Sequence, residues 1–326
     1  MLRQVRLPAV VVWTLLALAV AAPWLGLYPV LGMRMMCFAL FACAFNLLGG
    51  YGGLISFGHA ALFGGAGYIT GLALASWGWP TPAGIVAGVA AALAIGLVMG
   101  LLAVRRSGIY FSMITLALGQ IVYFYCLQAN FTGGEDGLQG IPRGTLFGLS
   151  LQSDRVMYYV VLVVFAASWW LMRRVVNSPF GQIVAAIREN EPRAISLGYR
   201  VNRYKLGMFL LSAGFAGLAG ALKAVVMGFE TLTDVHWSTS GLVVLMTLVG
   251  GLGTDLGPVL GAVLITVLEE KMGTIARFLV QVTGIGWFHH LSDSVSMVIG
   301  AIFVVCVLLF RRGIVGELRA RLQTAR

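Results

Sequence analysis

Long apolar stretches separated by short polar or glycine-rich connections run along most of the chain. Several approach the roughly 20 residues that a helix needs to cross the core of a bilayer. The eighth and ninth are short for full spans and could be half-helices that meet at the glycine turn around 250–257. The predicted segments are 7–28, 30–48, 54–76, 82–104, 109–129, 156–173, 205–229, 239–252, 258–271 and 291–310.

Composition agrees with this pattern. Of 326 residues, 59% are hydrophobic and 10% are charged, whereas a soluble domain typically carries about 25% charged residues. Alternating barrel strands are absent, and lipid satisfies no open backbone groups, so the segments are predicted to be helices. We therefore expect an all-α polytopic membrane protein with about 10 (8–10) transmembrane or half-spanning helices, in a single domain over 1–326. The first run is expected to stay as a span, because it continues to Tyr28 and further spans follow.

Basic residues predict the orientation, since they stay on the cytoplasmic side. With the N-terminus inside, sixteen of the 22 Lys and Arg residues fall in inside loops. Both termini are then cytoplasmic, and residues 311–326 form a basic cytoplasmic tail. The net charge of +10 thus reflects basic residues that orient the chain in the lipid bilayer. We expect no nucleic-acid partner.

Two glycine-rich turns predict an internal repeat. Residues 47–52 read LLGGYG and residues 248–253 read LVGGLG, and each turn joins two apolar runs. Both turns fall on the same side under the ten-segment count, which favours a parallel repeat, although chance similarity is the alternative. Small-residue spacing predicts close helix packing. The G-x-x-x-G pairs are Gly67/Gly71, Gly84/Gly88, Gly96/Gly100 and Gly257/Gly261.

One long polar segment, residues 178–205, reads SPFGQIVAAIRENEPRAISLGYRVNRYK. Asn177 or Ser178 can cap a helix whose first turn holds Pro179, and Pro192 can end it and begin a second short helix. Gly198 is a plausible left-handed stop. The caps and the apolar stripe favour a shaped surface that docks onto a partner, over a basic loop lying on anionic lipid headgroups. The stripe consists of Ile183, Val184 and Ile187.

An energy source of its own is not apparent in the chain. No G-x-x-x-x-G-K-[ST] phosphate loop occurs, and ion coupling would need ionisable groups at mid-membrane depth. No metal site and no catalytic set is expected, and the four cysteines read as small buried hydrophobes. An ion-coupled carrier and an intramembrane enzyme remain the alternatives. The candidate ionisable groups all fall near segment ends: Arg34, Lys223, Glu230, Glu269 and Glu270.

Several stretches resemble the membrane subunits of ABC importers for branched-chain amino acids, of the LivH/LivM type and nearer the M subunit. The resemblance spans nearly the whole chain, and the order and spacing of the stretches make it specific. They are GGYGGLISFGHAALFGGAGYITGLAL (49–74), SGIYFSMITLALGQIVYFYCLQANFTGGEDGL (107–138), SPFGQIVAAIRENEPRAISLGYRVNRYKLGMFLLSAGFAGLAGAL (178–222), LMTLVGGLGTDLGPVLGAVLITVLEE (245–270) and LFRRGIVG (309–316).

The resemblance implies a bacterial inner-membrane permease, paired with a homologous second permease subunit. Two cytoplasmic ATP-binding subunits would drive it, using ATP and Mg, while this chain binds no cofactor. A periplasmic substrate-binding protein would deliver the substrate. Residues 174–204 would then be a cytoplasmic coupling-helix loop seated on an ATPase, although the Glu-Ala-Ala triplet of other importers is missing. The implied coupling residues are Ala185, Ala186, Arg188, Glu189, Glu191, Pro192 and Gly198.

The substrate stays open within this family, which also includes permeases for urea, short amides and other amino acids, with sugar-transporting relatives. A leucine-like substrate needs an apolar pocket and groups for a zwitterion, and helix ends can supply the dipoles. Polar residues within apolar runs are candidates for the pathway. These residues are Asn46, Ser56, His59, Thr115 and Gln120. For His59 a packing role is the favoured interpretation, and for Asn46 and Gln120 an interhelical hydrogen bond is favoured.

Overall fold

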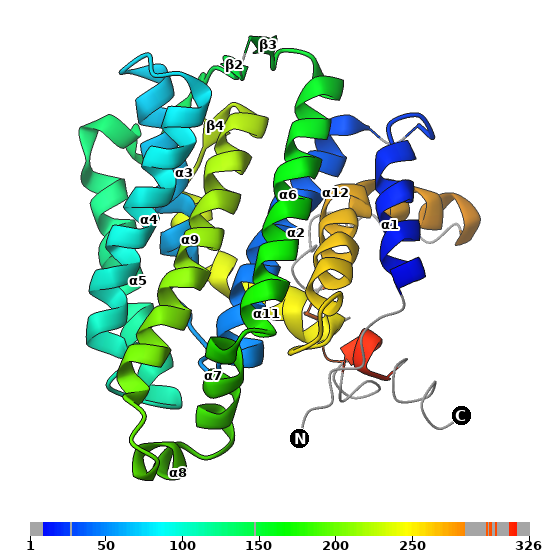
Figure 1. Cartoon of the computed structure of the whole chain (residues 1–326). Coiled ribbons are helices and arrows are strands. Elements are labelled where there is room, and N and C mark those ends of the chain that lie inside the picture. The colour runs from blue at the N-terminus through cyan, green and yellow to red at the C-terminus, as the bar shows by residue number, and fades with distance from the viewer. Residues whose placement is uncertain are drawn as a thin grey trace.

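The computed structural model describes residues 9–26, 28–146, 148–283 and 313–317, together with 298, 300, 301 and 304. These residues form a bundle of helices, with short strands at one end and α7 and α8 at the other (Figure 1). The elements are α1 (Ala9–Ala21), α2 (Pro29–Asn46), η1 (Leu47–Tyr51), α3 (His59–Ala75), α4 (Thr81–Ala103), α5 (Ile109–Gln128), η2 (Asn130–Thr132), η3 (Gly134–Asp136), β1 (Leu138–Gln139), β2 (Thr145–Leu146), β3 (Leu149–Ser150), α6 (Asp154–Val176), α7 (Pro179–Glu189), α8 (Glu191–Ser196), α9 (Val201–Met227), β4 (Phe229–Glu230), α10 (Leu232–Val235), α11 (Trp237–Gly250) and α12 (Gly257–Thr283).

The predicted fold class is confirmed. A helix overlaps each of the first nine expected segments, whereas most of the tenth, 291–310, lies outside the described residues. In the described part of the chain, five helices are long and apolar enough to cross a bilayer. They are Pro29–Tyr51 (α2 with η1), Thr81–Ala103, Ile109–Gln128, Asp154–Val176 and Val201–Met227.

Two of the expected segments differ from the prediction. The ninth is no half-helix, because α12 continues to Thr283 and has 27 residues. The third is expected to be helical from residue 54, but α3 begins only at His59 and has 17 residues. At 1.5 Å per residue, α3 and the 14-residue α11 are about 26 and 21 Å long, which is less than the roughly 30 Å hydrocarbon core. We refer to α3 and α11 as the two short helices.

The two short helices meet inside the bundle. The backbone N–H of Ala60, in the first turn of α3, donates to the Ser240 hydroxyl in the first turn of α11 at 2.8 Å. Ala60 is 1% exposed and Ser240 is fully buried. A helix start leaves N–H groups without intrahelical partners, and burial makes such groups costly unless they are paired. Ser240 therefore caps a helix that lies 180 residues earlier in the chain.

Small residues hold α3, α4 and α9 together. A Cβ added to Gly88 of α4 would meet the Ala66 carbonyl of α3 at 2.6 Å, and one added to Gly96 would meet Ala213 of α9 at 2.7 Å. A Cβ on Gly220 of α9 would contact the Phe63 carbonyl of α3. These helices approach so closely that no side chain fits between them, as expected for helix packing in lipid.

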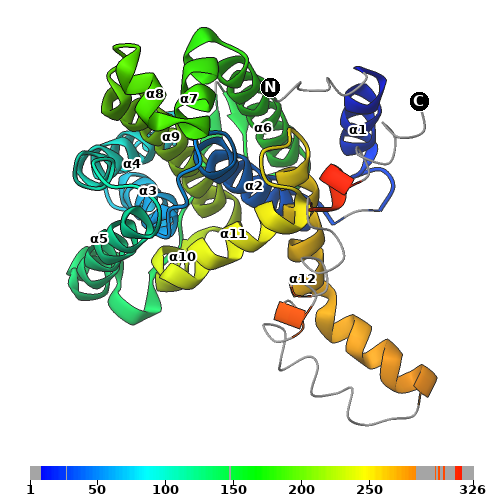
Figure 2. The same ribbon diagram turned by 90° about the horizontal axis from the view of Figure 1, so that it is seen from below.

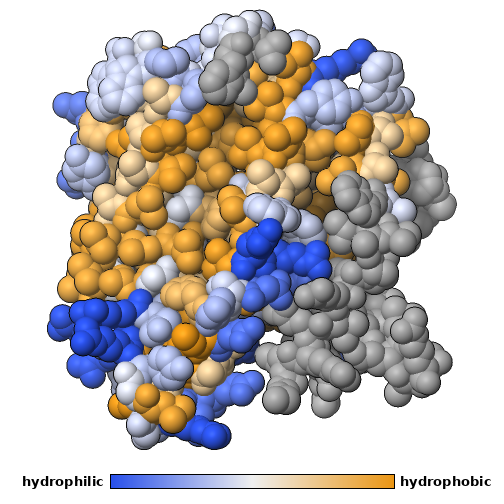
Figure 3. Space-filling view, viewed as in Figure 1, coloured by the Kyte–Doolittle hydropathy of each residue, from blue (hydrophilic) through white to orange (hydrophobic). Residues whose placement is uncertain are grey.

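Polar and apolar residues occupy different levels along the bundle axis. Hydrophobic residues cover the middle of the face in Figure 3, and hydrophilic residues gather at both ends. Short antiparallel pairs, β1 with β4 and β2 with β3, mark one end, which we call the strand end. The opposite end carries α7 and α8, which lie nearest the viewer in Figure 2, and we call it the α7–α8 end.

Candidate functional site

Local sequence signals shape the polar segment into two helices. The Ser178 hydroxyl accepts a hydrogen bond from the Gly181 N–H at 3.3 Å, with Pro179 in the first turn of α7. The chain breaks at Asn190, whose side chain accepts from the Arg193 N–H at 3.0 Å and caps α8. Gly198 then adopts φ +86°, the left-handed conformation that glycine favours. The predicted cap at Ser178 and the predicted stop at Gly198 are confirmed.

The apolar stripe of this segment faces the bundle. Ile187, Ala194 and Val201 form a small buried cluster, and Val184 is 3% exposed. On the opposite side Ala186, Glu189, Pro192 and Gly198 are exposed, while Ala185 and Glu191 are half-buried. Ile195 and Leu197 are 58% and 68% exposed, which is unusual for apolar residues beside so many charges. The segment thus keeps one face on the bundle and offers a mixed apolar and charged face outward.

Two basic residues of the segment have specific partners. The guanidinium of Arg188, in the last turn of α7, donates to the Gly50 carbonyl in η1. Lys205, at the start of α9, pairs with Glu191 at 2.7 Å. Arg188 therefore connects the predicted coupling segment with the first of the two glycine-rich turns.

The two glycine-rich turns lie against each other. The Asn46 amide donates to the Thr254 carbonyl at 3.0 Å, and its carbonyl oxygen accepts from the Gly253 N–H at 2.7 Å. A Cβ added to Gly50 would come within 2.7 Å of the Gly253 nitrogen. The repeated LLGGYG and LVGGLG stretches are thus neighbours in space as well as similar in sequence.

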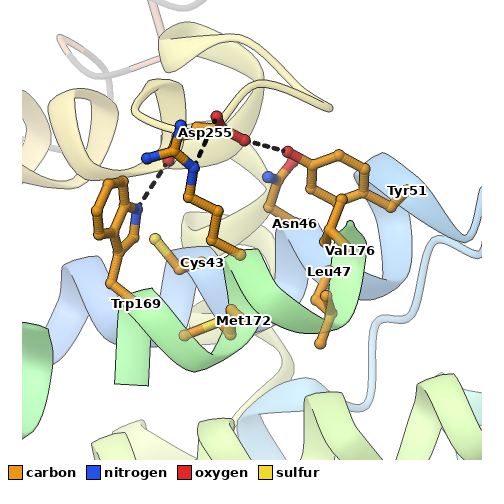
Figure 4. A pocket seen from close by; sticks show the side chains of 9 residues that line it. Cys43, Asn46, Leu47, Tyr51, Trp169, Met172, Val176 and Asp255 are labelled. Carbon is orange, nitrogen blue, oxygen red and sulfur yellow. Dashed lines mark hydrogen bonds and ion pairs between the residues drawn. The ribbon is translucent and has the colours of Figure 1, made fainter. Parts of the chain in front are cut away.

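A second set of contacts surrounds Asp255, just after the second turn (Figure 4). Its carboxylate accepts from the Tyr51 hydroxyl at 2.9 Å and lies 3.7 Å from the guanidinium of Arg173 in α6. The indole N–H of Trp169 donates to the Asp255 carbonyl at 3.1 Å. These residues border a cavity of about 20 Å³, which has room for about one water and none for an amino acid.

Three of the five pathway candidates gather at the start of α3. Thr115 of α5 accepts from the Phe57 N–H at 3.3 Å, and Ser56 accepts from the Gly58 N–H at 3.3 Å. Ser56, His59 and Thr115 are all fully buried. Gln120 is half-buried farther along α5, and Asn46 lies apart at the glycine turns. The structure therefore brings together only part of the predicted set.

His59 lies between helices in this conformation. Its Nε2 is 2.8 Å from the Ser212 hydroxyl in α9, and that hydroxyl donates its proton to the Ala44 carbonyl at 2.5 Å. Because the single hydroxyl proton is already used, Nε2 must carry the proton that joins His59 to Ser212. The ring packs edge-on against Phe45 and Phe209. These contacts link α2, α3 and α9.

A buried charge cluster at the strand end is a feature that the sequence did not predict. Lys223 pairs with Glu230 at 3.3 Å and also contacts Asp234. The side chains are 7%, 0% and 11% exposed, so these groups are enclosed although they lie near segment ends. By contrast, Arg34 of α2 pairs with Glu270 of α12 at 2.8 Å on the outside of the bundle.

The sequence analysis also did not predict contacts between residues that lie far apart in the sequence. Asp255, Arg173 and Tyr51 carry no local signal that would bring them together, since they lie in three separate segments. The exposed Ile195 and Leu197 could have been noticed, because apolar residues within a charged, capped segment already suggest a docking face.

The chain is similar to known permease proteins. The family described as "Branched-chain amino acid transport system / permease component" matches residues 31–308. The chain is 31% identical over 290 residues to the high-affinity branched-chain amino acid transport system permease protein LivM of Salmonella typhimurium, covering 79% of this chain and 67% of that protein. LivM of Escherichia coli is 30% identical with the same coverage. The autoinducer 2 import system permease protein LsrC of Yersinia pseudotuberculosis is 28% identical over 218 residues, covering 63% of this chain and 60% of LsrC. No solved structure matches the chain.

Proposed function

Because this chain belongs to the permease-component family of branched-chain amino acid transport systems, we propose that it is a membrane-spanning subunit of an ATP-driven importer for branched-chain amino acids. The family match carries this proposal, because it covers most of the chain, and the LivM relatives support the substrate class. The buried start of α3 offers a positive dipole end of the kind that can hold the carboxylate of an amino acid inside a bundle. The chain itself is a multi-pass protein of the bacterial inner membrane.

The α7–α8 segment is the proposed contact with a cytoplasmic ATP-binding subunit. In this arrangement the α7–α8 end faces the cytoplasm together with both termini, in agreement with the distribution of Lys and Arg. Ala186, Glu189 and Pro192 are exposed on this surface and would enter the ATPase groove, with Ile195 and Leu197 beside them. Arg188 would carry the movement inward through the Gly50 carbonyl.

The remaining parts of the importer are proposed to be separate proteins. A homologous second permease would complete the passage, two ATP-binding subunits would supply the energy, and a periplasmic binding protein would deliver the substrate. This chain would then perform no chemical step of its own. The pathway is proposed to pass the start of α3, where Ser56, His59 and Thr115 gather, and to continue toward Gln120.

The substrate class is tested by ATP hydrolysis in proteoliposomes that hold this chain with its co-expressed partners. The binding protein is added with leucine, with urea or with a sugar. Stimulation by leucine alone is the expected result. Stimulation by the sugar alone would instead favour an importer nearer to the LsrC relatives. If none of the three ligands stimulates ATP hydrolysis, the proposed function is contradicted.

The coupling role is tested by the double variant Arg188→Glu with Pro192→Gly. Reversing the charge at Arg188 removes the donor to Gly50, and glycine at 192 loosens the first turn of α8. We expect ATP hydrolysis to continue with little leucine uptake. Arg106→Glu is the matched control, because it reverses an exposed charge outside the α7–α8 segment. Full uptake by the double variant would refute the coupling role.

A further inference from the structure

The contacts at the α7–α8 end connect elements that are distant in sequence. Arg188 of α7 bonds to the Gly50 carbonyl of the first turn, and Asn46 bonds to both Gly253 and Thr254 of the second. The second turn directly follows α11, whose other end bonds to α3 through Ser240. Hydrogen bonds and short chain segments therefore connect α7 through both turns to both short helices.

The local backbone suits a stiff connection. Residues Leu47–Tyr51 form a π-helical turn, a conformation that is rare and is often found at functional positions. Asn46 is only 4% exposed, so its two hydrogen bonds are made away from water, where they are strong and costly to lose. Gly50 leaves no space between the turns, because a Cβ there would meet the Asn46 side chain. The two turns are therefore held at contact distance.

We propose that Asn46 and Arg188 are positioning residues that join α7 and both glycine turns into one mechanical unit, so that α3 and α11 move together when α7 moves. Arg188 acts on the first turn, which leads through residues 52–58 into α3. Asn46 passes the same displacement to the second turn and hence to the end of α11. This inference rests on the proposed function, since it takes α7 as the element that an ATPase displaces.

The proposal predicts which substitutions break the connection. Asn46→Leu removes both hydrogen bonds to the second turn, and Gly50→Ala places a methyl group where the turns touch. In the complete complex we expect either variant to import at least about tenfold less leucine per ATP hydrolysed, a difference of about 1.4 kcal/mol in coupling. Gly241→Ala is the matched control, because nothing lies within 4 Å of its added Cβ. It should keep the wild-type ratio.

A second measurement separates transmission from simple folding and needs no transport. Hydrogen–deuterium exchange is followed in the complete complex for peptides covering 47–58 and 248–257. Arg188→Ala touches only the first turn, yet the proposal expects faster exchange in both peptides. When Asn46→Leu is also present, Arg188→Ala should affect only the peptide 47–58. Unchanged exchange of 248–257 in Arg188→Ala would overturn the proposal.

The outcomes distinguish this inference from the proposed function. Failure of the wild-type complex to import leucine would contradict the proposed function, whatever the exchange data show. Wild-type import together with an unchanged leucine-to-ATP ratio in Asn46→Leu would overturn the mechanical unit and leave the proposed function standing. A lower melting temperature of Asn46→Leu with an unchanged ratio would also overturn it, since that result describes a merely structural residue.

Discussion

Replacing Lys223 by methionine removes the cation that faces two enclosed carboxylates at the strand end. The side chain of Lys223 is 7% exposed, and those of Glu230 and Asp234 are 0% and 11% exposed. Methionine has a similar length, so the change removes charge with little change in volume. Glu230 and Asp234 then lie close together without a counter-ion.

The size of the effect follows from the geometry. With an effective dielectric constant of about 20, two unit charges 3.3 Å apart attract by roughly 5 kcal/mol. Removing one partner of a buried pair typically costs about 3–5 kcal/mol, because the other charge stays desolvated. We therefore expect Lys223→Met to lower the free energy of unfolding by about 3–5 kcal/mol. Neutralising the carboxylates as well, with Glu230→Gln and Asp234→Asn, should recover most of this loss.

The assay is reversible unfolding of the purified chain by titration with sodium dodecyl sulfate in mixed micelles, followed by circular dichroism. Arg34→Met is the matched control, because Arg34 is 29% exposed and its partners Glu269 and Glu270 are 23% and 45% exposed. A pair of that exposure contributes at most about 1 kcal/mol. Equal losses in Lys223→Met and Arg34→Met would refute the reasoning, since burial would then make no difference.

Three further results are expected. Gly217→Ala should lower the free energy of unfolding by about 1–3 kcal/mol in the same titration, because the new methyl group contacts Ala92. The control Gly214→Ala should be nearly neutral, because its new methyl group meets the nearest neighbouring atom only at 3.4 Å. Leu197→Asp should reduce the amount of ATP-binding subunit that co-purifies with the chain by about tenfold or more, because burying a leucine contributes about 1.5–3 kcal/mol; an unchanged yield would exclude Leu197 from the contact. Ser178→Ala should speed hydrogen exchange at the start of α7, with a loss of about 1 kcal/mol of capping energy, and unchanged exchange would show that the cap contributes nothing.

Local rules made much of the fold predictable from the sequence. The cap at Ser178 and the left-handed Gly198 depend on neighbours within a few residues, so their residue types alone indicate the conformation. The apolar runs likewise predicted the helices. The late start of α3 at His59 was missed, because residues 54–58 are apolar enough to extend a span but are not helical.

The contacts of the candidate site could not be predicted in the same way. Asn46 and Gly253 are separated by 207 residues, and no residue type reveals which of many buried polar groups will pair. The similarity of the two glycine turns hinted at equivalent positions but gave no reason to place them in contact. The burial of Glu230 was missed for a related reason, because a residue near a segment end is normally expected to reach water.

The cap that Ser240 provides to α3 has a consequence for biogenesis. While the chain emerges from the ribosome, the first turn of α3 is made long before Ser240 exists, so the Ala60 amide has no partner from α11 during that interval. An unpaired amide is poorly tolerated in hydrocarbon. Until α11 is present, this amide needs a partner from water or from another polar group, and a nascent chain that stops before α11 lacks the Ser240 cap.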